Sequence, residues 1–288
     1  MVNFNSRLKD TRLHKFLLIG LFFSLVASCS GEKIDNGQVF RMPISNEPPT
    51  LDWSLATDSV SFDILTNIME GLTQYDSNME PVPAIAKRWE ISKNGKTITY
   101  YLRDDVFWTD GKPVTAHDFE YSWKRLLNPA TAAQYAYFLF DVENAQEFNS
   151  GKISDPSKVG VSAKTAHILE VRLKKPVVYF PSITTFMVTF PQRKDIVEKF
   201  GDHWTDPENI VTNGPFKLSA WEHEYKLILT ANENFYEGRP PLDTILAYVI
   251  REKTTALTLY ETGELEMVEL PPVAIPHFKN HQEYKNLP

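Results

Sequence analysis

Residues 81–127 constrain the fold more than any other part of the chain, because their spacing predicts three elements in a row. The dipeptide Asn94-Gly95 supplies a turn that can adopt a positive φ angle, and apolar residues alternate on either side of it. The alternating residues are Trp89, Ile91, Ile98, Tyr100 and Leu102. This pattern predicts a β-hairpin.

A capped helix is predicted directly after the hairpin. Asp110-Gly111 and Pro113 indicate a second tight turn, and Thr115 and Asp118 have the spacing of a capping box. The apolar residues that follow at helical spacing are Phe119, Trp123, Leu126 and Leu127. The whole stretch is therefore expected to fold as a hairpin, a loop and an amphipathic helix.

Shorter patterns predict further elements. A helix is expected from Val60 to Ile68, closed by Gly71. A strand is expected at 165–173, with His167, Leu169, Val171 and Leu173 on one face. Further strands are expected at residues 38–44, 225–229 and 242–250, and a further helix at 253–261.

The order of residues from Ala86 to Trp123 carries a stronger signal than the elements alone. It reads A-x-x-W-E-x-S-x-x-G-x-T-x-x-x-x-L-R-x-x-x-x-W-x-D-G-x-P-V-T-A-x-D-F-x-Y-S-W, and it resembles the signature of the extracytoplasmic solute-binding proteins of peptide ABC importers, solute-binding family 5. Further blocks that resemble the family are E-P-P-T-L-D at 47–52, M-E-G-L at 69–72, ENIVTNGPFKLSAW at 208–221 and GELEM at 263–267. The resemblance covers nearly all of the chain after residue 37.

The resemblance implies a fold and a division into domains. The expected fold is α/β with mixed sheets, periplasmic-binding-protein-like (type II), with an inserted subdomain. Residues 37–69 and 192–288 are expected to form lobe I, and residues 70–191 the inserted subdomain. Family members are longer than 288 residues, so the second lobe is expected to be missing from this sequence. In the family the two lobes close around the ligand like a hinge.

The first 36 residues predict a leader and a membrane anchor. A basic segment precedes the apolar run 16–27, which is shorter than the roughly 20 residues needed to cross a bilayer. Residues 1–28 therefore read as a signal peptide, and Val26-Ala27-Ser28-Cys29 resembles a bacterial lipoprotein box. Cys29, the single cysteine, is the predicted site of lipid attachment, and residues 29–36 read as a tether. This places the protein in the periplasm or cell envelope, held at a bacterial membrane.

Charge and motifs narrow the class of function. The net charge is −7, and residues 1–28 hold four basic and one acidic residue, so the remainder carries about −10. An acidic chain without a basic stripe is not expected to bind nucleic acid. The sequence lacks G-x-S-x-G, H-E-x-x-H, C-x-x-C and P-loop motifs, so neither an enzyme nor a cofactor is predicted. His277 and His281 have a metal-ligand spacing but lie in a polar segment, and they read as solvated histidines.

The first candidate ligand-binding residues are Thr57, Asp58 and Ser59. The resemblance implies that their main chain pairs with an extended peptide, as an added strand would. Asp58 or Ser59 could instead cap the following helix, and either could do both.

The other candidates lie further along the chain. The resemblance implies a ligand contact for Tyr135, which could equally be a core aromatic residue. Glu269 and Leu270 fall where relatives line the cleft with Tyr and Asn, so the residue types depart from the family pattern here. Trp89, Trp108 and Trp123 belong to the signature but are expected to be structural.

The resemblance implies the substrate-binding component of an ABC importer, which captures extended oligopeptides and delivers them to the permease subunits. Three alternatives stay open. The same fold could bind another solute, such as a dipeptide, nickel, haem or a sugar. The chain could be a non-binding remnant or a scaffold lipoprotein. A lipoprotein hydrolase would need a nucleophile and a base, and the sequence offers no such pair.

Overall fold

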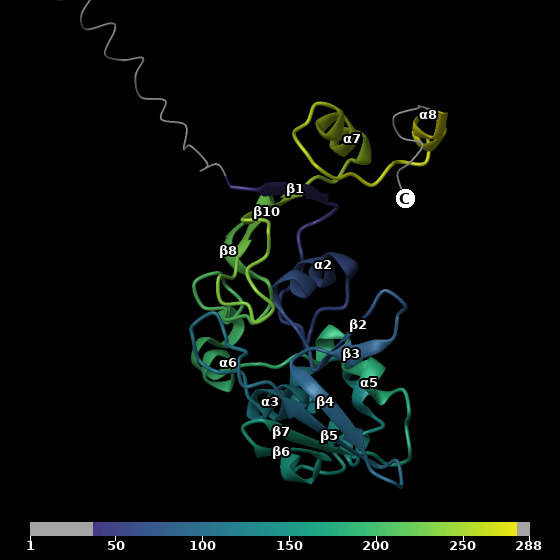
Figure 1. The fold of residues 1–288 in the computed structure, drawn as a ribbon, viewed down its shortest axis with the longest axis vertical. Helices are drawn as coiled ribbons and strands as arrows, with labels where there is room; N and C mark the ends of the chain where they lie inside the picture. The colour runs from purple at the N-terminus through teal and green to yellow at the C-terminus, as the bar shows by residue number, and fades with distance from the viewer. Residues whose placement is uncertain (1–36, 281–288) are drawn as a thin grey trace, which may run out of the picture. The chain divides into compact units, whose positions relative to one another are not determined.

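The computed structural model describes residues 37–280 of this protein (Figure 1). The contacts between residues form a compact unit that begins at Gln38. The predicted leader and the whole predicted tether, with Cys29, lie outside the described residues, as does His281.

The described strands form two four-stranded sheets and one two-stranded sheet. The larger sheets have the strand orders β1-β10-β9-β8 and β4-β5-β7-β6, and the small one pairs β2 with β3. The strands are β1 (Val39–Ile44), β2 (Thr73–Tyr75), β3 (Pro81–Pro83), β4 (Ala86–Ile91), β5 (Thr97–Leu102), β6 (Val161–Thr165), β7 (Ile168–Arg172), β8 (Phe216–Glu222), β9 (Lys226–Ala231) and β10 (Thr244–Val249).

Most of the described helices are short, and they lie between or after these strands. The α-helices are α2 (Ser59–Ile68), α3 (Ala116–Leu127), α4 (Ala145–Asn149), α5 (Phe180–Ile183), α6 (Lys194–Phe200), α7 (Lys253–Glu261) and α8 (Ile275–Asn280). The 3₁₀-helices are η1 (Pro129–Thr131), η2 (Gln134–Leu139), η3 (Pro156–Lys158), η4 (Met187–Thr189) and η5 (Gly201–His203).

The first large sheet joins the start of the described chain to residues 216–249. β1 runs parallel to β10, with Val39 opposite Thr244, whereas β10, β9 and β8 pair antiparallel. This sheet is therefore mixed. α2 packs against β8, and Leu227 and Leu229 of β9 are buried. Residues that are about 200 positions apart thus form the sheet that supports α2.

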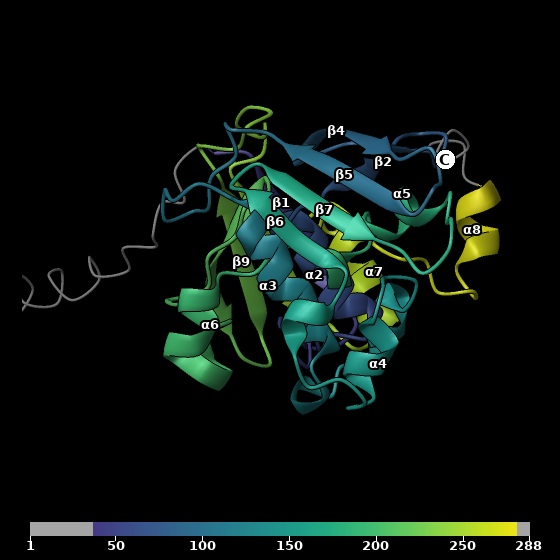
Figure 2. The same cartoon turned by 90° about the horizontal axis from the view of Figure 1, so that it is seen from below.

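The second large sheet contains the predicted hairpin. β4 and β5 pair antiparallel with Trp89 opposite Tyr100, and Gly95 in the turn has a φ of 68°. Ile98, Tyr100 and Leu102 are buried. Ile91 is exposed, because β4 is an edge strand and Ile91 lies next to the turn. Figure 2 shows this sheet with α3 packed against β6.

The predicted capping box and apolar face of α3 are both present. The Asp118 carboxylate accepts hydrogen bonds from the backbone N–H of Thr115 at 2.8 Å and from its hydroxyl at 3.0 Å. The four apolar residues predicted to face inward are buried; these are Phe119, Trp123, Leu126 and Leu127. The Trp123 indole also donates to the carbonyl of Thr189 at 2.7 Å, so α3 holds the segment of η4 in place.

Gly71 does not close α2 as expected. The helix ends at Ile68, and Met69 caps it in an extended conformation. The reason for a glycine at 71 is close packing, since an added Cβ would lie 2.6 Å from a ring carbon of Phe190 and 2.7 Å from the carbonyl of Thr184.

The prediction that His167 lies within a strand was also wrong. His167 lies in the turn before β7, which begins at Ile168.

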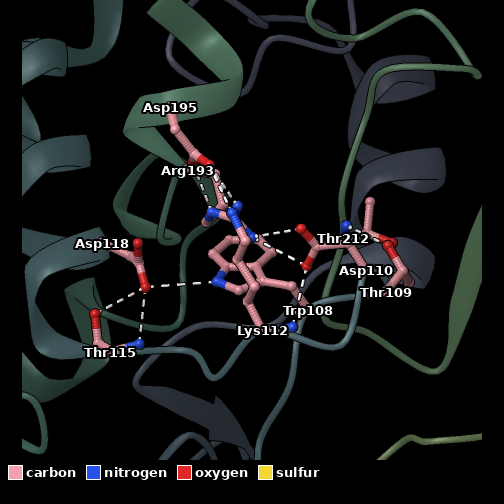
Figure 3. A network of polar contacts seen from close by, with 9 residues as sticks. All are labelled: Trp108, Thr109, Asp110, Lys112, Thr115, Asp118, Arg193, Asp195 and Thr212. Carbon is pink, nitrogen blue, oxygen red and sulfur yellow. Dashed lines mark hydrogen bonds and ion pairs between the residues drawn. The ribbon is translucent and has the colours of Figure 1, made fainter.

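Arg193 joins the turn after the hairpin to the start of α6 (Figure 3). Its side chain is 6% exposed. It donates to both carboxylate oxygens of Asp110 at 3.0 Å and to Asp195 through two bonds of 2.7 Å. Hydrogen bonds from Arg193 hold the pKa of the Asp195 carboxyl well below its usual range. We call Arg193, Asp110 and Asp195 the Arg193 clasp.

Candidate functional site

Asp58 caps α2, which confirms the capping alternative for this residue. Its carboxylate accepts a hydrogen bond from the backbone N–H of Ser61 at 2.9 Å and another from the Ser61 hydroxyl at 2.8 Å. Such a cap stabilises a helix by about 1 kcal/mol. Thr57 and Asp58 are half-buried, and Ser59 is exposed. The main chain at 57–59 is thus fixed by the helix that it begins.

Tyr135 contacts this segment from η2, 78 positions further along the chain. Its hydroxyl donates a hydrogen bond of 3.3 Å to the carbonyl of Thr57. The Tyr135 side chain is half-buried, so it lies at the edge of the core rather than inside it. The structure therefore brings Thr57 and Tyr135, two of the predicted site residues, into direct contact.

Tyr135 belongs to a cluster of five aromatic rings, which we call the aromatic wall. Its members are Phe62 of α2, Tyr135, Tyr137 and Phe138 of η2, and Phe186 before η4. Neighbouring ring centroids lie 4.7–6.3 Å apart. Four rings are half-buried, while Tyr137 is 53% exposed. Aromatic surfaces of this kind line many ligand sites.

The other four rings of the wall were not predicted as site residues. The sequence does show the segments of Tyr137, Phe138 and Phe186 as aromatic-rich, at 134–140 and 180–190, whereas Phe62 lies in the predicted helix 60–68. Periodicity could not identify the faces of Tyr137, Phe138 and Phe186, because η2 is a 3₁₀-helix and Phe186 lies outside a regular element. Their proximity to Thr57 results from tertiary contacts.

A buried ion pair fixes the chain just before this site. Asp52 is 5% exposed, and its carboxylate accepts hydrogen bonds of 2.9 and 2.5 Å from the guanidinium of Arg125 in α3. The Trp204 indole donates to the same carboxylate at 3.3 Å, and the Gln192 amide donates to the Ser54 hydroxyl at 3.0 Å. Residues 52–54 are therefore anchored to α3 and to residues after it.

Glu269 and Leu270 are placed differently. Glu269 is exposed and forms an ion pair with Lys253 of α7, and Leu270 is half-buried. Within residues 37–280, no hydrogen bond, ion pair or ring contact joins either residue to Thr57, Ser59 or Tyr135. A ligand role for these two residues stays a prediction.

Among residues 37–280, no group of three or more His, Cys, Asp or Glu side chains is arranged to hold a metal ion. No helix in the same part of the chain is both long and apolar enough to span a bilayer.

Comparison with known proteins places the chain among solute-binding proteins. The model of the bacterial extracellular solute-binding proteins, family 5 Middle, matches residues 80–287. The chain is 34% identical over 268 residues to the dipeptide-binding protein DppE of Bacillus subtilis, and 36% identical over 264 residues to the oligopeptide-binding protein OppA of the same organism. These alignments cover 88% and 87% of this chain but 49% and 48% of the relatives, so the chain spans about half their length.

Solved structures give the same result and confirm the predicted fold class. The substrate-binding domain of an oligopeptide ABC transporter from Bacillus anthracis matches with a TM-score of 0.82 and 35% identity, over 88% of this chain and 49% of that one. Listeria monocytogenes OppA bound to peptide matches with a TM-score of 0.81 and 30% identity, over 86% and 50%. Because the family model covers more than half of the chain, this protein belongs to the bacterial extracellular solute-binding proteins of family 5.

Proposed function

We propose that this chain binds the main chain of an extended oligopeptide along residues 57–59, as the substrate-binding component of an ABC importer. The observation that carries the proposal is the hydrogen bond from Tyr135 to the carbonyl of Thr57, beside the aromatic wall. It joins two segments that the sequence resemblance separately implied as ligand-lining. Relatives named for binding oligopeptides or dipeptides support the same reading.

The geometry suits recognition that does not depend on the peptide's side chains. A peptide that pairs through its own main chain, as an added strand does, gains these hydrogen bonds whatever its sequence. The Asp58 carboxylate accepts two hydrogen bonds from Ser61, so it holds the segment at the start of α2. Such a site binds and releases its ligand, and we propose no chemical step for it.

The anchor and the partners belong to the same proposal. Cys29 follows an apolar run as in a bacterial lipoprotein box, which supports lipid attachment and a position at the outer face of a membrane. The permease subunits of the importer would then be the receiving partner.

We expect Cys29→Ala to move the protein from the membrane fraction to the soluble fraction of cells. Equal membrane retention of the variant would contradict the anchor.

The test of peptide binding is calorimetric titration of the purified protein with tri- to pentapeptides. We expect binding, and a loss of roughly three- to tenfold in affinity for Tyr135→Phe, because the variant lacks the hydroxyl that holds Thr57. Tyr179→Phe is the matched control, since the Tyr179 hydroxyl donates to Asp141 outside the site. We expect this control to bind as the wild type does.

Two results would count against the proposal. A folded wild-type sample that produces no heat with any peptide would leave the chain as a non-binding relative. Equal losses in Tyr135→Phe and Tyr179→Phe would mean that the contact with Thr57 plays no part in binding.

A further inference from the structure

Tyr137 is the member of the aromatic wall that water reaches most easily, with 53% of its surface exposed. Its ring is stacked on Phe138, with centroids 4.7 Å apart and planes 25° apart. Tyr135 contacts it edge-on at 6.0 Å and 88°. Phe138 therefore covers one face of the Tyr137 ring, while about half of the residue stays accessible to water.

The exposure of Tyr137 differs from that of an isolated surface aromatic residue. Single exposed aromatic side chains are ordinary, whereas continuous apolar surface marks a place where something binds. The Tyr137 ring contacts Tyr135 and Phe138, and so adjoins the four half-buried rings of the wall. Tyr135 in turn links those rings to the main chain at Thr57. The exposed Tyr137 ring is thus separated only by the Tyr135 ring from residues 57–59, where we propose that the peptide binds.

We propose that Tyr137 and the aromatic wall select a peptide that presents an aromatic or large aliphatic side chain to this face. This inference rests on the proposed function and names the ligand class of the same site. Offset or edge-on ring contacts add attraction beyond burial of area. A charged side chain placed against these rings would lose water without gaining a hydrogen bond or an ionic partner from the rings themselves.

The experiment compares peptides that differ at one position. Tetra-alanine serves as the host, and Phe, Leu, Arg or Asp replaces each alanine in turn. Dissociation constants come from chemical-shift titration, which also measures weak binding. At one position we expect Phe and Leu to bind at least about fivefold more tightly than Arg or Asp.

The variants test whether Tyr137 causes that preference. We expect Tyr137→Ala to lower the ratio of Phe-peptide affinity to tetra-alanine affinity by roughly three- to tenfold, and Tyr137→Phe to keep the wild-type ratio, because the ring remains. Tyr179→Ala is the matched control, since Tyr179 is 54% exposed and lies outside the wall. We expect its ratio to equal that of the wild type.

Different failures point to different errors. Binding of tetra-alanine without any preference for Phe or Leu, or a preference for Arg, overturns the inference and leaves the proposed function intact. A Phe preference that persists in Tyr137→Ala also overturns it. If a folded wild-type protein binds none of the peptides, the proposed function itself is wrong, and the inference falls with it.

Discussion

Glu70 follows α2 directly, and its carboxyl group is largely withdrawn from water. Burial raises the pKa of this carboxyl to about 7, and the charge of Glu237 acts in the same direction, while Tyr236 and Arg103 oppose the shift. The Oε2 atom of Glu70 and the Tyr236 hydroxyl lie close together, yet neither has a well-formed hydrogen bond. The backbone around the group is fixed, because the N–H of Glu70 donates to the Asn213 side chain at 2.9 Å.

This pKa makes stability depend on pH in a defined direction. The folded state holds the proton up to about pH 7, whereas an ordinary glutamate releases it near 4.5. The contribution of this carboxyl group to the unfolding free energy is therefore fully present below about pH 4.5, and it is lost as the pH rises through 7. We expect Glu70→Gln to gain unfolding free energy relative to the wild type between pH 5 and pH 8, by about 2–3 kcal/mol. Urea unfolding at pH 5 and at pH 8 measures this gain in unfolding free energy. Glu208→Gln is the control, because Glu208 is exposed. A constant difference between wild type and Glu70→Gln would contradict the shift.

At the scale of elements, the sequence predicted what neighbouring residues determine. The hairpin follows from Asn94-Gly95 and the alternation around it, and the start of α3 follows from Thr115 and Asp118. These signals are local, so they needed no knowledge of the rest of the chain. Gly71 shows the limit, because the same residue type that ends helices is required there by the ring of Phe190, 119 positions away.

The residues of the candidate site were predicted in a different way. Thr57, Asp58, Ser59 and Tyr135 were named from the resemblance, and the capping role of Asp58 from its position before a helix. The contact between Tyr135 and Thr57 could not be derived from spacing, because it joins η2 to the start of α2. The aromatic wall was missed because its rings come from three separate segments.

At the scale of the whole described unit, one continuous apolar core includes residues of both large sheets. It contains Ile44 and Ala247 of the first sheet and Tyr100 and Val171 of the second. The predicted division into lobe I and an inserted subdomain, at 69–70 and 191–192, would pass through this core. Arg193 lies just after the second boundary and pairs with Asp110 inside the predicted subdomain. The Arg193 clasp therefore connects the two predicted parts.

We expect Arg193→Met to lower the unfolding free energy by roughly 2–3 kcal/mol, because Asp110 and Asp195 lose a buried cationic partner. Lys112→Met is the matched control, since Lys112 pairs with Asp195 at 2.9 Å but is 60% exposed, and such surface pairs contribute about 1 kcal/mol or less. Urea unfolding followed by both tryptophan fluorescence and far-ultraviolet circular dichroism measures the effect. If the clasp couples the two parts, the two signals coincide in the wild type and separate in Arg193→Met. Equal effects of the two substitutions on stability would mean that Arg193 acts as an ordinary surface charge, and that the shared apolar core alone holds the parts together.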